Sequence, residues 1–168
     1  MSAQAHPKLA LRPFLPADVP LLAEIFRASI EQLTGDDYSE TQQKAWASAA
    51  DDEAAFSKWL SSGLTLVATL SGSQVGFAAL AAGNKIDLLY VHPAAAGRGV
   101  AAMLTDALEK LAGGRGAPLL TVDASDSARG FFEKRGYVAQ QRNTVLARGE
   151  WLANTTLHKQ LAAKREAS

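Results

Sequence analysis

The chain has 168 residues, of which 48% are apolar and 20% are charged, as in an ordinary globular domain large enough for one core. Its 17 basic and 17 acidic side chains cancel, so no excess of charge favours a nucleic acid or an anionic membrane as a partner. The sequence contains no cysteine, which excludes disulfides, thiolate metal sites and cysteine nucleophiles.

The first residues, MSAQAHPKLALRP, lack the basic-then-apolar pattern of a signal peptide. No apolar run approaches the ~20 residues that span a bilayer. We therefore expect a cytoplasmic protein. The three histidines (His6, His92 and His158) are scattered without the spacing of metal ligands, so no metal site is expected.

One strand and three helices are predicted for the N-terminal third of the chain. The strand covers residues 9–14 and ends before Pro16. Each helix is recognised by a residue whose side chain can cap its first turn. These caps are Asp18 for a helix that runs to Leu33, Ser39 with Gln42 for a helix through Trp46, and Asp51 or Asp52 for a third helix.

The rest of the chain consists of short apolar runs and two helical segments. The expected strands are 64–70, 75–81, 86–91, 119–123, 137–147 and 151–161, and the expected helices run from Val100 to Gly113–Gly114 and over 126–135. This order predicts a single mixed α/β domain over residues 9–162 with a central sheet. Residues 1–8 are expected to form a flexible N-terminus and residues 163–168 a C-terminal tail.

The segment LLYVHPAAAGRGVAAML (88–104) carries the clearest functional signal. An apolar strand enters a loop that opens a helix, where unpaired backbone N–H groups and the helix dipole favour an anion. Gly97 and Gly99 let the backbone approach a ligand closely, and Arg98 can reach a phosphate. The alternative is a plain glycine turn with a solvated arginine. A Walker-type phosphate-binding loop is excluded, because no Gly-Lys-Ser or Gly-Lys-Thr follows. The fingerprint of a dinucleotide-binding site is also a poor match, because the loop has two glycines where that fingerprint has three.

The sequence YVHPAAAGRGVAAML resembles the acetyl-CoA signature of the GNAT superfamily of N-acyltransferases, and ARGFFEKRGY (128–137) resembles the last helix of that family with the strand after it. The resemblance covers residues 9–161. It implies a mostly antiparallel sheet with splayed middle strands, and acetyl-CoA as co-substrate. The residues implied to contact the cofactor are Leu89, Tyr90, Val91, Ala96, Gly97, Arg98, Gly99, Val100, Ala101, Ser125 and Phe132.

Two positions depart from the family pattern. Ala96 stands where Gln or Arg is usual, so one side-chain contact to the pyrophosphate is lost while the backbone donors remain. Phe132 stands where a tyrosine often protonates the leaving thiolate, and a phenyl ring has no proton to donate. That role must pass to another residue, to water or to nothing.

Acyl transfer to an amine needs a neutral amine, a polarised thioester carbonyl and a proton for the thiolate. Asp87 is the candidate general base, acting directly or through water; the alternative is an exposed carboxylate in a salt bridge. The resemblance implies that a backbone N–H near Tyr90 or Val91 polarises the carbonyl. The Tyr90 hydroxyl is the candidate acid, and the alternative is a ring that packs in the sheet. Ser125 either contacts the cofactor or caps a helix.

Recognition of the acceptor is expected from the helical region before residue 64. Tyr38 and Trp46 are the candidate acceptor contacts together with Asp87, and Asp36 and Asp37 are placed to attract a cationic amine. The alternative is that Trp46 belongs to the core and the aspartates to loops and caps.

The sequence thus predicts an N-acetyltransferase that uses acetyl-CoA and acts on a primary amine of a small molecule or a protein, without a metal. Because Phe132 lacks a proton donor, a non-catalytic CoA-binding or regulatory module is the alternative. A nucleotide-binding protein using the same loop is a third. The closing hairpin and a sheet edge make a homodimer conceivable.

Overall fold

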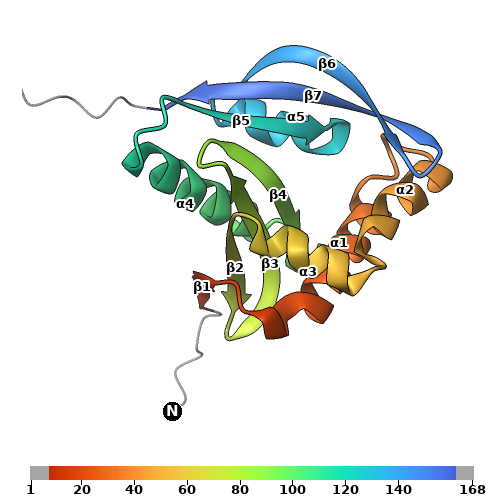
Figure 1. The fold of residues 1–168 in the computed structure, drawn as a ribbon, viewed down its shortest axis with the longest axis horizontal. Coiled ribbons are helices and arrows are strands. Elements are labelled where there is room, and N and C mark those ends of the chain that lie inside the picture. Colours follow the sequence, from red (N-terminus) through yellow and green to blue (C-terminus); the bar gives the residue numbers. More distant parts are fainter. Residues whose placement is uncertain (1–7, 162–168) are drawn as a thin grey trace, which may run out of the picture.

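The computed structural model describes residues 8–161, which fold around one seven-stranded sheet (Figure 1). The strands are β1 (Leu9–Pro13), β2 (Leu64–Leu70), β3 (Ser73–Ala81), β4 (Lys85–Val91), β5 (Leu119–Ser125), β6 (Val138–Ala147) and β7 (Glu150–Gln160). The helices are α1 (Val19–Leu33), α2 (Glu40–Ala47), α3 (Glu53–Ser61), α4 (Val100–Gly114) and α5 (Asp126–Lys134). Apart from Lys8, the expected flexible N-terminus and C-terminal tail lie outside the described residues. No helix in the described part is long and apolar enough to cross a membrane.

The strand order is β1-β2-β3-β4-β5-β7-β6. Neighbouring strands are antiparallel except β4 and β5, which are parallel because α4 connects them. The β6–β7 hairpin turns at Arg148 and Gly149, whose φ angles of 47° and 84° suit a tight hairpin. The predicted mixed α/β domain with a mostly antiparallel sheet is confirmed.

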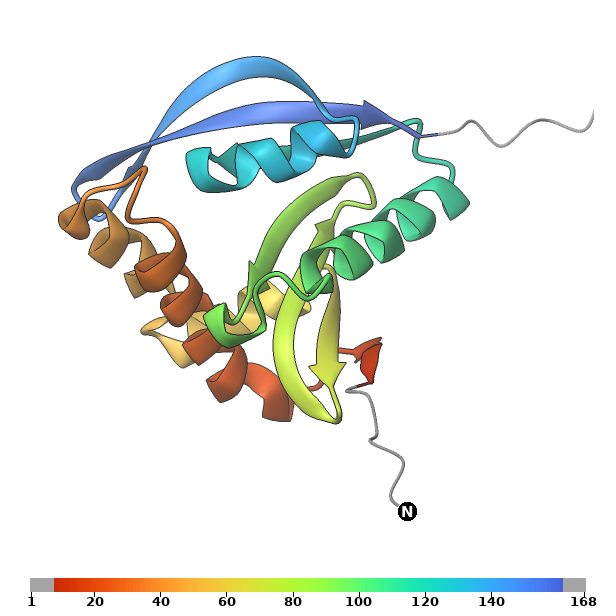
Figure 2. The same ribbon diagram turned by 180° about the vertical axis from the view of Figure 1, so that it is seen from behind.

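Helices cover both faces of the sheet, and each face has its own apolar core. On one face α4 packs on β3 and β4, and α5 packs on β5 and β7 (Figure 2). That core buries Leu104, Leu108 and Phe132 completely or nearly so. On the other face α1 and α3 pack on β2 to β4 around Phe26 and Phe56. Burial of these apolar side chains is the main stabilising contribution.

Most predicted helix ends are confirmed, including the end of α4. The capping box of Ser39 and Gln42 is present, and Asp52 caps α3. The glycine pair predicted to end α4, Gly113 and Gly114, forms its last two residues. Just beyond the helix, Gly116 has a φ of +86°, which lets the N–H of Ala117 donate back to the carbonyl of Ala112.

The predicted cap Asp18 is at the N-terminus of α1, but its side chain does not cap that helix. Its carboxylate is buried and pairs with Arg12 at 2.7 and 2.8 Å, and it accepts further hydrogen bonds from the N–H of Leu15 and from Gln74. The carboxylate therefore ties β1 to the turn that leads into α1. These contacts, led by the hydrogen bonds from Arg12, lower the pKa of Asp18 to about 2.

We expect Asp18→Asn to lower the free energy of unfolding by about 2 kcal/mol at pH 7. The folded-state pKa lies below the unfolded one, so the stabilisation is present above the unfolded value and is lost as the pH falls toward 2. Urea unfolding at pH 7 and pH 3 measures this, and the difference between variant and parent should shrink at the lower pH. Asp51→Asn is the control, because its exposed pair with Arg27 spans 3.9 Å. Equal losses in both variants would contradict the assignment.

Candidate active site

The sheet opens between β4 and β5. The two strands pair only at Lys85 with Thr121 and at Ile86 with Val122, and then diverge (Figure 1). The opening is a cleft of about 230 Å³. It is lined by Ser29, Ile30, Leu33, Thr34, Trp46, Ile86, Asp87, Leu88, Leu89, Tyr90, Val91, Val122, Asp123, Ala124, Ser125, Ser127, Ala128 and Phe132. The splayed middle strands expected from the sequence are therefore present and form the walls of a site.

A β-bulge in β4 places Asp87 in this cleft. The residues that pair with Ile86 and Leu88 are consecutive in β3, so Asp87 has no partner there. Ile86 consequently belongs to the core under α4 and Leu88 to the core under α1 and α3, although residues two apart in a regular strand share a face. Asp87 lies on the Leu88 face, where its Oδ2 accepts a hydrogen bond from Nε1 of Trp59 at 2.6 Å.

Beyond the bulge, alternate backbone groups of β4 face the opening. The N–H of His92 donates to the carbonyl of Val75 at 2.8 Å, which fixes the phase of the β3–β4 ladder. Tyr90 therefore exchanges its backbone hydrogen bonds with β3. The N–H groups of Leu89 and Val91 point the other way, toward the side where β5 has diverged. These groups are available to a carbonyl or amide lying in the cleft.

Tyr90 lies within an aromatic cluster and also lines the cleft. Its ring stacks on Phe77 at 5.7 Å and lies 4.5 Å from Phe26. Its hydroxyl accepts a hydrogen bond from Nε1 of Trp46 at 3.3 Å. No acceptor for the hydroxyl proton is present among residues 8–161, and burial raises the pKa of Tyr90. The ring of Tyr90 is thus packed against the sheet, as the packing interpretation expected. Its protonated hydroxyl is also free to donate, as the interpretation of Tyr90 as the acid requires.

The loop before α4 has the geometry of an anion site. Gly97 and Gly99 have φ angles of 78° and 81°, and a Cβ on either would meet no atom within 4 Å. Within residues 8–161, the backbone N–H groups from Gly97 to Ala102 have no protein acceptor. Val100 and Ala101 thus begin α4 with free donors, and Ala96 and Arg98 are exposed beside them. The loop offers an uninterrupted set of donors to a phosphate group.

Gly76 in β3 leaves the space that this loop and the first turn of α4 need to lie against the sheet. A Cβ at Gly76 would lie 2.9 Å from Cγ1 of Val100 and 3.0 Å from the carbonyl oxygen of Tyr90. Only a glycine therefore lets the first turn of α4 approach β3 and β4 so closely. This contact keeps the loop and its free donors close to the end of β4.

The start of α5 forms the opposite wall. The Ser125 hydroxyl accepts a hydrogen bond from the N–H of Ala128 at 3.1 Å, so it caps α5 and also lines the cleft. Phe132 is 1% exposed and contributes a purely apolar side chain to the lining of the cleft. The cap interpretation of Ser125 is confirmed, and its contact with a cofactor stays a prediction.

Of the two aromatic residues predicted to contact the acceptor, Trp46 lines the cleft and Tyr38 does not. Tyr38 is 6% exposed and packs edge-on against Trp46 at 5.3 Å. Its hydroxyl donates to the carbonyl of Ala153 and accepts from the N–H of Asp126. The backbone thus uses both hydrogen-bonding directions of the hydroxyl, which gives Tyr38 a supporting role beside the cleft, and its contact with an acceptor stays a prediction.

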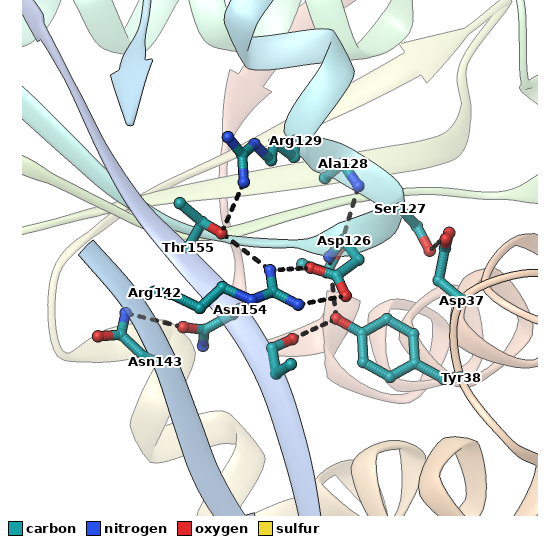
Figure 3. A network of polar contacts seen from close by, with 12 residues as sticks. Asp37, Tyr38, Asp126, Ser127, Ala128, Arg129, Arg142, Asn143, Asn154 and Thr155 are labelled. Carbon is teal, nitrogen blue, oxygen red and sulfur yellow. Dashed lines mark hydrogen bonds and ion pairs between the residues drawn. The ribbon is translucent and has the colours of Figure 1, made fainter. Parts of the chain in front are cut away.

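Tyr38 belongs to a polar network that joins the loop before α2 to the start of α5 and to the β6–β7 hairpin (Figure 3). Arg142 of β6 pairs with Asp126 through contacts of 2.5 and 2.9 Å, and this lowers the pKa of Asp126. Ser127 donates to Asp37 at 2.8 Å, which ties α5 to the loop before α2. Asp36 and Asp37 are both exposed, and Asp37 has Ser127 as its hydrogen-bond partner.

Trp59 and Gly76 were not anticipated as site residues. Trp59 has the helical spacing of an ordinary core residue, and Gly76 stands in an apolar strand. Each owes its role to a partner distant in the sequence, Asp87 for the first and Val100 for the second. No local pattern marks either of them.

The splayed sheet, the cleft and the helix with free N–H groups together define an acetyltransferase. The family described as "Acetyltransferase (GNAT) domain" matches residues 34–154. The chain belongs to the GNAT family of acetyltransferases.

Similar proteins agree with this assignment. The "Uncharacterized N-acetyltransferase YafP" of Escherichia coli K12 is 33% identical over 146 residues, which cover 87% of this chain and 92% of that protein. The crystal structure of a GCN5-related N-acetyltransferase from Rhodopseudomonas palustris is 64% identical with a TM-score of 0.90, and covers 96% of this chain and 99% of that one. The PaiA N-acetyltransferase of Thermoplasma acidophilum, in complex with coenzyme A, has the same fold, with a TM-score of 0.75 at 17% identity. The match covers 91% of this chain and 99% of that one.

Proposed function

We propose that this acetyltransferase moves an acetyl group from acetyl-CoA to a primary amine of a small molecule or a protein, by direct attack of the amine on the thioester. The observation that carries the proposal is that the β4 residues with free N–H groups and Asp87 line one cleft, while the loop that follows β4 carries a further run of free N–H groups at the start of α4. The complex of the Thermoplasma relative with coenzyme A supports the choice of cofactor.

The residues present fit coenzyme A. We place the pyrophosphate on the N–H groups from Gly97 to Ala102, with Arg98 beside it, because a run of unpaired donors at a helix N-terminus binds phosphate. The pantetheine arm would run along Leu89 and Val91, with Ser125 and Phe132 opposite. The missing side chain at Ala96 costs little in this arrangement, since the backbone supplies the donors.

Acetyl-CoA supplies an activated acetyl group whose thiol leaves when the amine nitrogen bonds to the carbonyl carbon. Asp87 takes the proton that the amine nitrogen must lose. The N–H of Val91 hydrogen-bonds the carbonyl oxygen, on which negative charge develops. The Tyr90 hydroxyl gives its proton to the departing sulfur, a role that Phe132 cannot fill.

Thermal-shift titration with acetyl-CoA, CoA, ATP and NAD tests the cofactor, and thiol release with a panel of amines tests the reaction. Stabilisation by the CoA compounds alone, followed by thiol release, is the expected result, since excess ligand adds ~3 kcal/mol at a hundredfold over its dissociation constant. Binding without turnover on every amine would favour the non-catalytic module instead. Stabilisation by ATP or NAD would favour the nucleotide-binding alternative.

Tyr90→Phe is expected to lower kcat at least about tenfold with little change in acetyl-CoA binding, because the ring stays and only the proton donor is lost. Stopped-time assays of thiol release measure this. Tyr137→Phe is the matched control, since it removes an identical hydroxyl that donates to Glu109 outside the cleft. If Tyr90→Phe turns over as fast as the control, the ring only packs and the acid lies elsewhere.

The cytoplasmic location and the homodimer stay predictions. β6 is an edge strand of the sheet. Three of its apolar side chains, and one on the adjacent β7, are exposed: Val138, Val145, Leu146 and Trp151. A second copy that paired along this edge would cover them.

A further inference from the structure

The charges that line the cleft distinguish one kind of acceptor from others. Among the lining residues, all within 8–161, there is no Lys, Arg or His, and the charged side chains are Asp87 and Asp123. Asp123 is already compensated, because Lys85 lies 3.0 Å from one oxygen and Thr156 donates to the other. Asp87 accepts only the neutral indole N–H of Trp59, and none of the ion pairs of the described residues includes it. A half-buried carboxylate of this kind is best satisfied by a cation brought by the ligand.

The wall next to Asp87 is apolar and aromatic. Trp46 and Tyr90 lie 6.4 Å apart with their rings at 68°, so they form two sides of a corner. Ile30 is fully buried behind them, whereas Leu33 at the rim is 47% exposed. A large apolar side chain exposed at the mouth of a cleft becomes covered only when an apolar group enters.

Two polar side chains of this wall, Thr34 and Ser29, donate their hydroxyl protons to the protein. The Thr34 hydroxyl donates to the carbonyl of Ile30 and accepts from Gln43. The Ser29 hydroxyl donates to the carbonyl of Phe26. The wall therefore offers few donors to a carboxylate or to the hydroxyls of a sugar.

We propose, on the basis of the function above, that the acceptor is a small arylalkylamine, with a primary ammonium on a short chain that ends in an aromatic ring and with no carboxylate. The ammonium pairs with Asp87 and the ring enters the corner of Trp46 and Tyr90 beside Leu33. An α-carboxylate on the same molecule is rejected, because it would lie near the charge of Asp87 without a cation to pair with.

Two acceptors that differ in one group test this inference. Thiol release should proceed with kcat/KM about a hundredfold higher for 2-phenylethylamine than for L-phenylalanine, which differs only by its carboxylate. Spermidine, which has no ring, should also be a poor acceptor. Comparable kcat/KM for phenylalanine or for spermidine would overturn the proposal.

A variant that supplies the missing cation sharpens the test. Leu33→Arg should lower the ratio of kcat/KM for 2-phenylethylamine to kcat/KM for phenylalanine at least about tenfold. The guanidinium would pair with the carboxylate of phenylalanine, and the loss of the leucine would weaken the contact with the ring of either acceptor. Leu15→Arg adds the same charge at a residue that is 54% exposed and not part of the cleft, and should keep the parental ratio. An unchanged ratio in Leu33→Arg would overturn the placement of the carboxylate.

Binding separates this inference from the proposed function. With CoA present, 2-phenylethylamine should raise the melting temperature of the wild type more than phenylalanine does, and Asp87→Asn should lose that difference. If no amine releases thiol, the catalytic proposal fails, while selective stabilisation by 2-phenylethylamine still supports the ligand class. Equal stabilisation by both compounds, or by neither, overturns it.

Discussion

Glutamate in place of Gly99 is expected to abolish the stabilisation by acetyl-CoA and to lower kcat/KM at least about a hundredfold. The residue has a φ of +81°, which other side chains rarely adopt, and a Cβ there would project into open space beside the free N–H groups. In the proposed complex the pyrophosphate fills that space. The added carboxylate would both exclude it and repel its charge. Thermal-shift titration and thiol release measure the two losses.

Gly83→Glu is the control for backbone strain. Gly83 has a φ of +75°, and an added Cβ there also meets no atom within 4 Å, but it lies in the turn that precedes β4 and does not line the cleft. It should share the small loss of stability and keep cofactor binding. Normal binding by Gly99→Glu would place the cofactor elsewhere on the molecule.

Asp87→Asn is expected to lower kcat/KM by about 10² to 10³ near neutral pH, with acetyl-CoA binding unchanged. The amide keeps the shape of the side chain, and its oxygen can still accept from Trp59, but it cannot take a proton from the amine. The loss should diminish as the pH approaches 10, because the acceptor is then neutral without help. A pH profile of thiol release is therefore the decisive measurement.

Trp59→Phe tests how much of the activity depends on the position of the Asp87 carboxylate, because this variant removes its hydrogen-bond donor and keeps the carboxylate itself. Removal of the indole N–H leaves the carboxylate in the cleft but without its 2.6 Å donor, so a smaller loss of kcat/KM, about tenfold, is expected. Because the base remains, the pH profile should keep the parental shape. If Asp87→Asn matches the parent at every pH, the carboxylate is neither the base nor the partner of the ammonium.

The element order was predictable because it rests on local chemistry. The capping box of Ser39 and Gln42 and the turn at Arg148 and Gly149 involve residues within a few positions of each other. The loop around Gly97 and Gly99 was recognised for the same reason. Its free donors follow from the start of a helix, whatever the rest of the fold.

The geometry of β4 was not predictable from the sequence. The strand is an apolar run whose two faces are both covered by helices: Ile86, Leu88, Leu89, Tyr90 and Val91. Apolar and polar residues therefore do not alternate along it, and the sequence does not show which side chains share a face or where a bulge lies. The supporting role of Tyr38 depends on Ala153, 115 residues later in the chain. Such contacts arise only when the sheet has assembled.

The bulge has a consequence for how β4 is specified. If Asp87 were deleted, Ile86 and Leu88 would become neighbours in β4 and would pair with neighbouring residues of β3 without a bulge. Successive side chains of a regular strand point to opposite faces, so Ile86 would remain under α4. Leu88 and Tyr90 would remain under α1 and α3. The hydrophobic pattern therefore works equally well with a strand one residue shorter. Asp87 is an insertion that core packing does not require, so the shortened chain should fold while losing the carboxylate from its cleft.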